Sequence, residues 1–344
     1  MRSGPLVHLL WVLFSGVGIV ACSGTDRKTL VVYSPHGKEM LSDFEMAYES
    51  RHQDVDVQWL DMGSQDVYDR IRTERSNPQA DLWWGAPWLM FMRAEEEGLL
   101  ESYHPTWRDS IEDEYRSVGG YWYGTFLTPE VIMYNNRVID AGEAPRDWDD
   151  LLEKKWKGKI IIRYPLASGT MRIIYSALIQ RASRLSGQGP DAGFLWLLAL
   201  DANTRSYTAD PTQLYIRIAR EEGLITLWNL PDVVTQRDLN GYPFGYTIPE
   251  SGTPMIIDGI AIVRGTEKRE EAIRFYEFVT SQEALNLQAE KYYRIPARLD
   301  AQRPSWLGAV MLKPMDVDWK EIAAAEKEWM KRWDETVKGQ GASD

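Results

Sequence analysis

Cysteine and histidine are the scarcest chemically reactive residues of this sequence. The 344 residues include one cysteine, Cys22, and four histidines. A single cysteine excludes a disulfide within the chain, so the fold must be stabilised by its core. The sequence also lacks Cys-x-x-Cys and His-Glu-x-x-His motifs, a P-loop and a complete G-x-G-x-x-G. We therefore expect no metal centre and no bound cofactor.

Basic residues are also in deficit. There are 51 Asp and Glu against 39 Lys and Arg, which gives a formal net charge of −12, and the basic residues form no cluster. A chain this acidic repels nucleic-acid phosphates, so we expect no nucleic-acid partner. The length allows one large domain or two ordinary domains, each with a full core.

A short apolar run opens the chain. Leu6 to Ala21 contain no charged residue and follow Arg2; the run is too short and poorly flanked for a stable membrane span, but it has the form of a signal peptide. It ends in Ile-Val-Ala-Cys, which resembles the lipobox of bacterial lipoproteins. We therefore expect a signal peptide over 1–21, lipidation at Cys22 and a polar tether over 22–28; the alternative is that Cys22 is a lone buried thiol. Removal of 1–21 takes away one positive charge and brings the net charge from −12 to −13.

Strand-like and helix-like segments alternate after the tether. Apolar runs at 29–34, 54–62 and 80–87 predict strands, and helical spacing of apolar residues separates them. This alternation predicts a mainly parallel α/β sheet that binds ligands at the carboxyl ends of its strands. Longer strand-like stretches at 123–136 and 241–265 bracket a second α/β series. We therefore expect two lobes that two crossovers join through a hinge.

Six stretches of the chain carry a resemblance to a known family. They are VVYSPHGKEM (31–40), ADLWWGAP (80–87), EEGLLESY (96–103), VIMYNN (131–136), LASGTMR (166–172) and the block from DGIAIV to YYRIPARLD (258–300). Together they resemble the extracytoplasmic solute-binding proteins of ABC importers, in the type II subgroup that includes ferric-iron and sugar-phosphate binders. The resemblance covers nearly all of 29–300.

The resemblance implies an α/β, two-lobed, periplasmic-binding-protein-like type II fold with a ligand cleft between the lobes. Lobe 1 is expected to comprise 29–127 and 256–344, and lobe 2 to comprise 128–255. The implied partners are a small-molecule ligand and separate ABC permease and ATPase subunits. The implied location is extracytoplasmic, in the periplasm or on the outer face of the cell membrane, with the lipid as the only membrane anchor. We expect a monomer.

The junction after the strand at 160–162 is the first candidate binding site. Small polar residues and an arginine open a helix there: Ser168, Gly169, Thr170 and Arg172. A helix N-terminus offers free N–H groups and the positive end of the helix dipole, so this turn predicts an anion cradle, with Arg163 as a second basic candidate. The alternatives are an ordinary Ser/Thr cap and a serine nucleophile, although no G-x-S-x-G elbow surrounds Ser168.

Other candidates follow strands or turns elsewhere. Ser34 and His36 end the first strand, and Trp84 with Gly85 ends the third; we expect Trp84 to line the cleft and its neighbour Trp83 to enter the core. Asp232 opens a helix, where it is either a ligand acceptor or an ordinary cap. Glu250 lies in a turn that reaches the hinge side of the pocket or merely links two strands.

The sequence therefore predicts a lipid-anchored, non-enzymatic component of an ABC importer that captures a small anionic solute, phosphorylated or carboxylated, by hinge closure. One alternative is a ferric-iron binder, because the first-loop histidine of that branch matches His36. However, the segment that supplies two tyrosines in that branch corresponds here to 227–234, which has none, and the pair at 292–293 is expected to serve packing. A second alternative is a hydrolase on the same scaffold.

Overall fold

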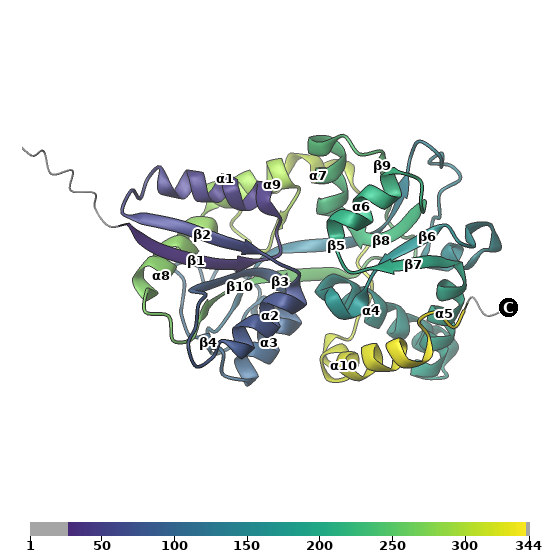
Figure 1. Ribbon diagram of the computed structural model, residues 1–344, viewed down its shortest axis with the longest axis horizontal. Coiled ribbons are helices and arrows are strands. Elements are labelled where there is room, and N and C mark those ends of the chain that lie inside the picture. Colours follow the sequence, from purple (N-terminus) through teal and green to yellow (C-terminus); the bar gives the residue numbers. More distant parts are fainter. Residues whose placement is uncertain (1–26, 342–344) are drawn as a thin grey trace, which may run out of the picture.

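The two lobes lie side by side along the long axis of the molecule (Figure 1). The computed structural model describes residues 27–341; the expected signal peptide and Cys22 lie outside them and stay predictions. Arg27 and Lys28, which we expected in the tether, belong to the fold. Lys28 begins the first strand, and the Arg27 guanidinium pairs with Glu49 at 2.6 Å. The α/β fold class is confirmed.

A single sheet runs through both lobes of the described chain. Its main path has the order β2-β1-β3-β10-β5-β8-β6-β7, and β4, β9 and β11 pair beside it. The strands are β1 (Lys28–Ser34), β2 (Val55–Asp61), β3 (Leu82–Pro87), β4 (Leu100–Glu101), β5 (Tyr123–Asn135), β6 (Ile160–Arg163), β7 (Thr204–Thr208), β8 (Ile225–Asn229), β9 (Phe244–Thr247), β10 (Met255–Val263) and β11 (Ile295–Pro296).

The long strand β5 connects the lobes by changing its partner halfway along. Its first half pairs antiparallel with β10 up to Pro129, and its second half pairs with β8 from Glu130 onward. On either side, β1 runs parallel to β2 and β3, and β6 runs parallel to β7 and β8. The carboxyl ends of both parallel sets therefore point towards the junction of the lobes (Figure 1).

Helices cover the sheet in both lobes (Figure 1). They are α1 (Lys38–Glu49), α2 (Ser64–Thr73), α3 (Trp88–Glu96), α4 (Gly169–Ser186), α5 (Pro190–Asn203), α6 (Pro211–Ala219), α7 (Leu230–Asn240), α8 (Arg269–Val279), α9 (Gln282–Tyr292) and α10 (Trp319–Thr336), with short 3₁₀ turns at Asp113–Tyr115, Trp148–Leu152, Lys154–Trp156, Pro165–Ala167 and Ser305–Ala309. No described helix is long and apolar enough to cross a membrane.

Side-chain caps fix the starts of the three helices that face the junction from the second lobe. Ser168 accepts a hydrogen bond from the Met171 amide at the start of α4. Asp210 caps α6 and Asn229 caps α7 in the same way. Each cap stabilises its helix by about 1 kcal/mol, so the backbone of these first turns is held in place before any ligand arrives.

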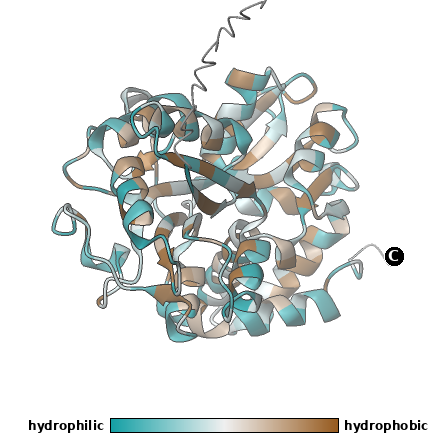
Figure 2. Cartoon of the chain, turned by 60° about the vertical axis from the view of Figure 1, so that its left-hand side comes forward, coloured by the Kyte–Doolittle hydropathy of each residue, from teal (hydrophilic) through white to brown (hydrophobic). Residues whose placement is uncertain are grey.

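Hydrophobic residues concentrate on the strands and on the inward sides of the helices (Figure 2). In β3, Trp83 and Trp84 point to opposite faces, as the alternation of a strand requires. Trp83 stacks on Phe91 with ring centres 4.1 Å apart, while Trp84 meets Phe44 edge-on at 5.4 Å. Both indoles are fully buried, so one tryptophan serves each core of the first lobe.

The C-terminal helix departs from the expected lobe 1, which was to include everything from 256 to 344. α10 packs against α4, and Trp329 and Trp333 are buried in the core of the second lobe. Figure 1 shows α10 in yellow beside α4 and α5, on the far side of the junction from β1. The chain thus crosses between the lobes a third time after α9. The remaining boundaries of the two lobes stay a prediction.

Candidate functional site

The two lobes touch where their strand ends meet. A methyl group added to Gly169, at the start of α4, would come within 2.9 Å of Cδ of Pro87 at the end of β3. A methyl group on Gly63, just before α2, would lie 3.1 Å from the Ala167 carbonyl and 3.2 Å from Nη2 of Arg163. The absence of a side chain at these two glycines therefore allows the lobes to approach each other. The lobes are in contact in this structure, with α2 packed against the turn Pro165–Ala167 that precedes α4.

Arg163 is the most unusual side chain at this junction. It is 3% exposed, and among the described residues Nε and Nη1 have no hydrogen-bond partner. Nη2 makes one long hydrogen bond, 3.4 Å, to the Ala167 carbonyl. Burial lowers the pKa of its guanidinium, and the nearby Asp210 carboxylate opposes that shift. A guanidinium with five donors and one weak acceptor leaves room for an oxyanion.

The predicted cradle residues divide into structural and available ones. The Ser168 hydroxyl caps α4 and accepts a hydrogen bond from the Met171 amide at 3.3 Å, as the alternative of an ordinary Ser/Thr cap predicted. Gly169 is buried by the contact with Pro87, and Thr170 beside it is half-buried. A helix leaves its first four N–H groups without internal partners, and at the start of α4 the Ser168 cap satisfies the Met171 amide.

Arg172 is the clearest correction within the cradle. Its Nη1 binds Oε1 of Glu326 on α10 at 2.8 Å, and its Nη2 donates to the Leu166 carbonyl at 3.1 Å. Arg93 of α3 binds the other oxygen of Glu326. The anion that Arg172 holds is therefore a carboxylate of its own chain. We predicted a ligand there because an arginine in a first helical turn opposes the helix dipole, and no local pattern indicates a partner 154 residues away.

His36 and Gly85 form one unit. The imidazole lies over Gly85, where a methyl group would come within 2.4 Å of its Cε1 and Nε2, and a φ of +98° also favours glycine. Among the described residues Nε2 has no partner, and burial together with Arg294 lowers the pKa of His36 well below its usual value. The imidazole is therefore neutral at neutral pH. Gly85 makes room for it, and Ser34 is a buried residue whose Oγ accepts the His36 amide at 3.3 Å.

Trp84 does not line a cleft, contrary to our expectation. Its indole is fully buried, with His36 edge-on at 5.3 Å on one side and Phe44 on another. The strand alternation that separates it from Trp83 was predicted correctly, but both faces of β3 are covered by helices. Both indoles are therefore enclosed by the protein, and neither reaches a cleft.

Asp232 lies at the junction but already has partners. Its Oδ2 accepts the Asn229 amide side chain at 2.8 Å and the Trp228 indole N–H at 3.2 Å. Its Oδ1 accepts Nη2 of Arg294, from the segment after α9, at 3.0 Å. This ion pair joins the two lobes. The cap of α7 is Asn229, so the cap alternative for Asp232 is wrong.

Glu250 is not brought to the junction. Its side chain is exposed, its amide donates to the Arg146 carbonyl, and its carbonyl accepts from Lys313. Both partners belong to loops around the outside of the second lobe. Glu250 therefore belongs to a turn that merely links β9 to β10, which was the simpler of the two alternatives.

The sequence reasoning missed a buried polar row on β5. Glu130 is fully buried, and neither of its carboxylate oxygens has a hydrogen-bond partner among the described residues. Asp258 on β10 accepts the Thr128 hydroxyl at 2.7 Å, and Arg294 lies over the Phe126 ring at 5.0 Å. A signal was present, because Glu130 is the one charged residue of β5.

Of the tyrosine pair at 292–293, Tyr292 packs in the core, as we expected for the pair. Tyr292 is buried and its hydroxyl donates to the Asp43 carboxylate and the Glu39 carbonyl. The Tyr293 hydroxyl donates to Asp238 at 2.6 Å. No group of three or more His, Cys, Asp or Glu that could hold a metal ion occurs within residues 27–341.

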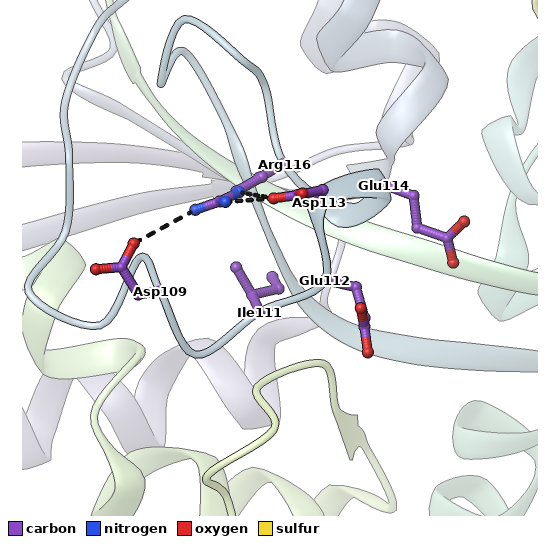
Figure 3. Close-up of a pocket in the computed structure, with 6 residues that line it drawn as sticks. All are labelled: Asp109, Ile111, Glu112, Asp113, Glu114 and Arg116. Carbon is purple, nitrogen blue, oxygen red and sulfur yellow. Dashed lines mark hydrogen bonds and ion pairs between the residues drawn. The ribbon is translucent and has the colours of Figure 1, made fainter.

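A surface hollow of about 460 Å³ lies away from the strand ends, in the loop before β5 (Figure 3). Its lining is mainly acidic, and Arg116 within it is already paired with Asp113 and lies 3.9 Å from Asp109. The figure shows the Glu112 and Glu114 side chains directed away from this pair. Nothing in the hollow is both buried and unpaired, so it offers no site comparable to that of Arg163.

Known proteins match over nearly the whole chain. A probable ABC transporter periplasmic-binding protein of Sinorhizobium fredii is 26% identical over 338 residues, covering 96% of this chain and 93% of its own length. A putative 2-aminoethylphosphonate-binding periplasmic protein of Salmonella typhimurium is 26% identical over 292 residues, covering 82% and 79%.

Solved structures agree with the two-lobed fold. The periplasmic binding protein AfuA from Actinobacillus pleuropneumoniae, solved with exogenous fructose-6-phosphate bound, is 25% identical with a TM-score of 0.78 and covers 91% of this chain and 99% of its own. Ferric-binding proteins also share the fold, for example that of Campylobacter jejuni, but at 19% identity the likeness concerns the fold alone.

The family follows from these matches and from the two-lobed fold. Residues 44–312, well over half of the chain, match the bacterial extracellular solute-binding proteins. The relatives are binding proteins of ABC transporters, which places this chain among extracytoplasmic transport components. The protein belongs to the bacterial extracellular solute-binding protein family.

Proposed function

We propose that this protein captures a small solute through an anionic group, phosphoryl or carboxylate, that binds at Arg163 between the lobes. The observation that carries the proposal is a guanidinium that is 3% exposed and has two N–H-bearing nitrogens without partners. An unpaired buried charge costs several kcal/mol, and proteins normally compensate it with a counter-ion. The solute would supply that counter-ion.

The surrounding backbone supports an anion in the same place. Two helices, α2 and α4, begin within contact distance of Arg163, and the positive ends of their dipoles favour negative charge. α2 begins after Gly63 without a side-chain cap, which leaves its first amides for a ligand. Two of the relatives carry phosphonate or phosphate ligands in their names, and their match to this chain supports the same chemistry here.

Closure of the lobes on the solute would be a hinge motion about β5 and β10. In this structure the lobes are linked by Asp232 with Arg294 and by Arg93 with Glu326. A ligand that contacts both lobes adds to these links and shifts the equilibrium towards closure. The closed protein would then deliver its solute to a separate permease and its ATPase subunits.

The remaining features of the proposal come from the first residues and from the family. Lipidation at Cys22 would anchor a monomer to the membrane, in the periplasm or on the outer face of the cell membrane. The protein would not be an enzyme, since its relatives are binding proteins and the Ser168 hydroxyl has a capping role. Iron binding stays an alternative, tested by a visible charge-transfer band on addition of ferric ion.

The test begins with a thermal-shift screen of the full chain against phosphorylated and carboxylated metabolites, followed by calorimetry of the hits. Arg163→Met should weaken binding by about 1.5–3 kcal/mol, the range for hydrogen bonds to charged groups. Without ligand the variant should be at least as stable as the wild type, because an uncompensated buried charge is removed. Arg75→Met, at an exposed position, is the matched control. Wild-type affinity in Arg163→Met would refute the proposal.

A further inference from the structure

One face of β5 forms the floor of the junction between the lobes. Phe126, Thr128 and Glu130 alternate along the strand and so project from the same face. The His36 ring and the Arg294 guanidinium each lie 5.0 Å from the centre of the Phe126 ring. His36 and Arg294 therefore contact one end of this row, at Phe126, and Glu130 lies at the other end.

Glu130 has no structural partner that explains its presence. Its side chain is completely buried, and neither carboxylate oxygen accepts or donates a hydrogen bond within the described chain. A buried carboxyl group without partners is destabilising, whether charged or neutral. Packing alone would be served better by an apolar residue of similar size, as at most other positions of this strand.

The charges that face Glu130 are mostly negative. They are Asp258 on β10 and Asp232 on α7, with Arg294 as the one opposing cation. Burial and the two carboxylates raise the pKa of Glu130 well above its usual value. Burial also raises the pKa of Asp258 and of Asp61, at the end of β2. Arg294 donates through Nη2 to Asp232, and within the described chain no hydrogen bond joins it to Glu130.

Arg163 and Glu130 lie on nearby strands of one sheet. Arg163 ends β6 and Glu130 lies on β5, and β8 is the strand between them. Glu130 is opposite Asn229 in the β5–β8 register, and the Asn229 side chain donates to Asp232. The Tyr215 hydroxyl lies 3.3 Å from Asp232 and accepts the Trp228 indole N–H. The unpaired cation and the unpaired acid are thus one strand apart in the sheet that spans the junction.

We infer that Glu130, assisted by Asp258 and Asp232, binds an ammonium group of the solute whose anionic group binds at Arg163. An ammonium carries three N–H donors and a positive charge, which fits a carboxylate whose two oxygens have no partner and which lies near two further acidic groups. The solute would then be a zwitterion, such as an amino acid-like or aminoalkyl-phosphoryl compound. The inference rests on the proposed function for the anionic end.

Binding of an ammonium group would change the protonation of Glu130. The neutral carboxyl of Glu130 would lose its proton to the buffer as the carboxylate forms its contact with the ammonium. The positive charge of the solute takes the place of that proton, so charge balances. Proton release gives the inference a signature that a purely structural role of Glu130 would not produce.

The test uses pairs of small anions that differ by one ammonium group. They are ethylphosphonate and 2-aminoethylphosphonate, propionate and β-alanine, and glucose 6-phosphate and glucosamine 6-phosphate, with ethanolamine as a cation alone. Calorimetry of the full chain should show at least a tenfold lower Kd for the ammonium-bearing member of one or more pairs. Glu130→Gln should reduce that ratio to threefold or less and leave the Kd of the plain anion within threefold.

Further measurements separate an ammonium site at Glu130 from a purely structural role of this residue. The enthalpy of zwitterion binding should depend on the ionisation enthalpy of the buffer in the wild type and lose that dependence in Glu130→Gln. Glu250→Gln, at an exposed position, should change neither readout. If Glu130→Gln fails to fold, Glu130→Asp, which withdraws the carboxylate by one methylene, should also lower the preference.

The outcomes distinguish this inference from the proposed function. Equal affinity within every pair, or a preference that survives in a folded Glu130→Gln, would overturn the ammonium site and leave the anion site standing. Binding of ethanolamine with no binding of any anion would overturn the anion site instead. Absence of binding across the whole panel would count against both.

Discussion

The carboxylate of Glu326 is expected to be among the most stabilising single polar groups of the C-terminal helix. Its side chain is 3% exposed and binds two guanidinium groups, one from Arg172 of α4 at 2.8 Å and one from Arg93 of α3. Glu326→Gln keeps the volume and removes the charge, which leaves two partly buried cations without their anion. Removal of one partner from a buried pair costs about 3–5 kcal/mol.

The structure indicates the lower end of that range. Arg172 keeps its hydrogen bond to the Leu166 carbonyl, at 3.1 Å. The Arg93 side chain is 24% exposed and can turn toward water, which lowers its penalty. We therefore expect Glu326→Gln to lower the free energy of unfolding by about 3 kcal/mol.

Urea denaturation of the full chain measures this loss, and a double-mutant cycle with Arg172→Met assigns it. The two substitutions should be coupled by about 0.5–3 kcal/mol, because they remove the same contact. Glu328→Gln is the control, since Glu328 is exposed on the same helix and surface changes usually stay within about 0.5 kcal/mol. A Glu326→Gln variant as stable as this control would refute the reasoning.

Three further predictions concern closure, pH and the anchor. Arg93→Met should loosen the link from α3 to Glu326 and raise the radius of gyration of the unliganded protein in small-angle scattering, while Arg75→Met should not. Because burial raises the pKa of Glu130 and of Asp258, the folded state keeps protons that the unfolded state loses above about pH 4. The free energy of unfolding should therefore fall as the pH rises above that value, and more shallowly in Glu130→Gln. Cys22→Ser should release the protein from the membrane fraction, whereas retention there would contradict lipidation.

The fold was predictable because its signals are local. The runs at 29–34, 54–62 and 80–87 contain β1, β2 and β3 to within a residue or two, and the long stretch at 123–136 became the crossover strand β5. Strand alternation separated Trp83 from Trp84 correctly. The position of α10 was not predictable, because its apolar stripe would fit either lobe and only the complementary surface of α4 decides between them.

The residues of the proposed site were predictable only in part. The rule that ligands bind beyond the carboxyl ends of parallel strands led to His36, while the helix starts after β6 and β8 led to Arg163 and Asp232. The same rule cannot tell an available side chain from an engaged one. Arg172 and Arg163 looked alike in the sequence, and long-range partners made the first a structural residue.

Arg163 and Glu130 together show why availability matters more than residue type. Most of the other charged side chains at the junction are compensated within the chain: Arg172 by Glu326, and Arg294 by Asp232. Among the described residues, Arg163 and Glu130 are buried and uncompensated and carry opposite tendencies, one a guanidinium short of acceptors and the other a carboxyl short of donors. They do not compensate each other in this structure. A solute that carries both an anion and an ammonium would satisfy both groups at once, and the closed lobes would exclude the water that otherwise competes for them.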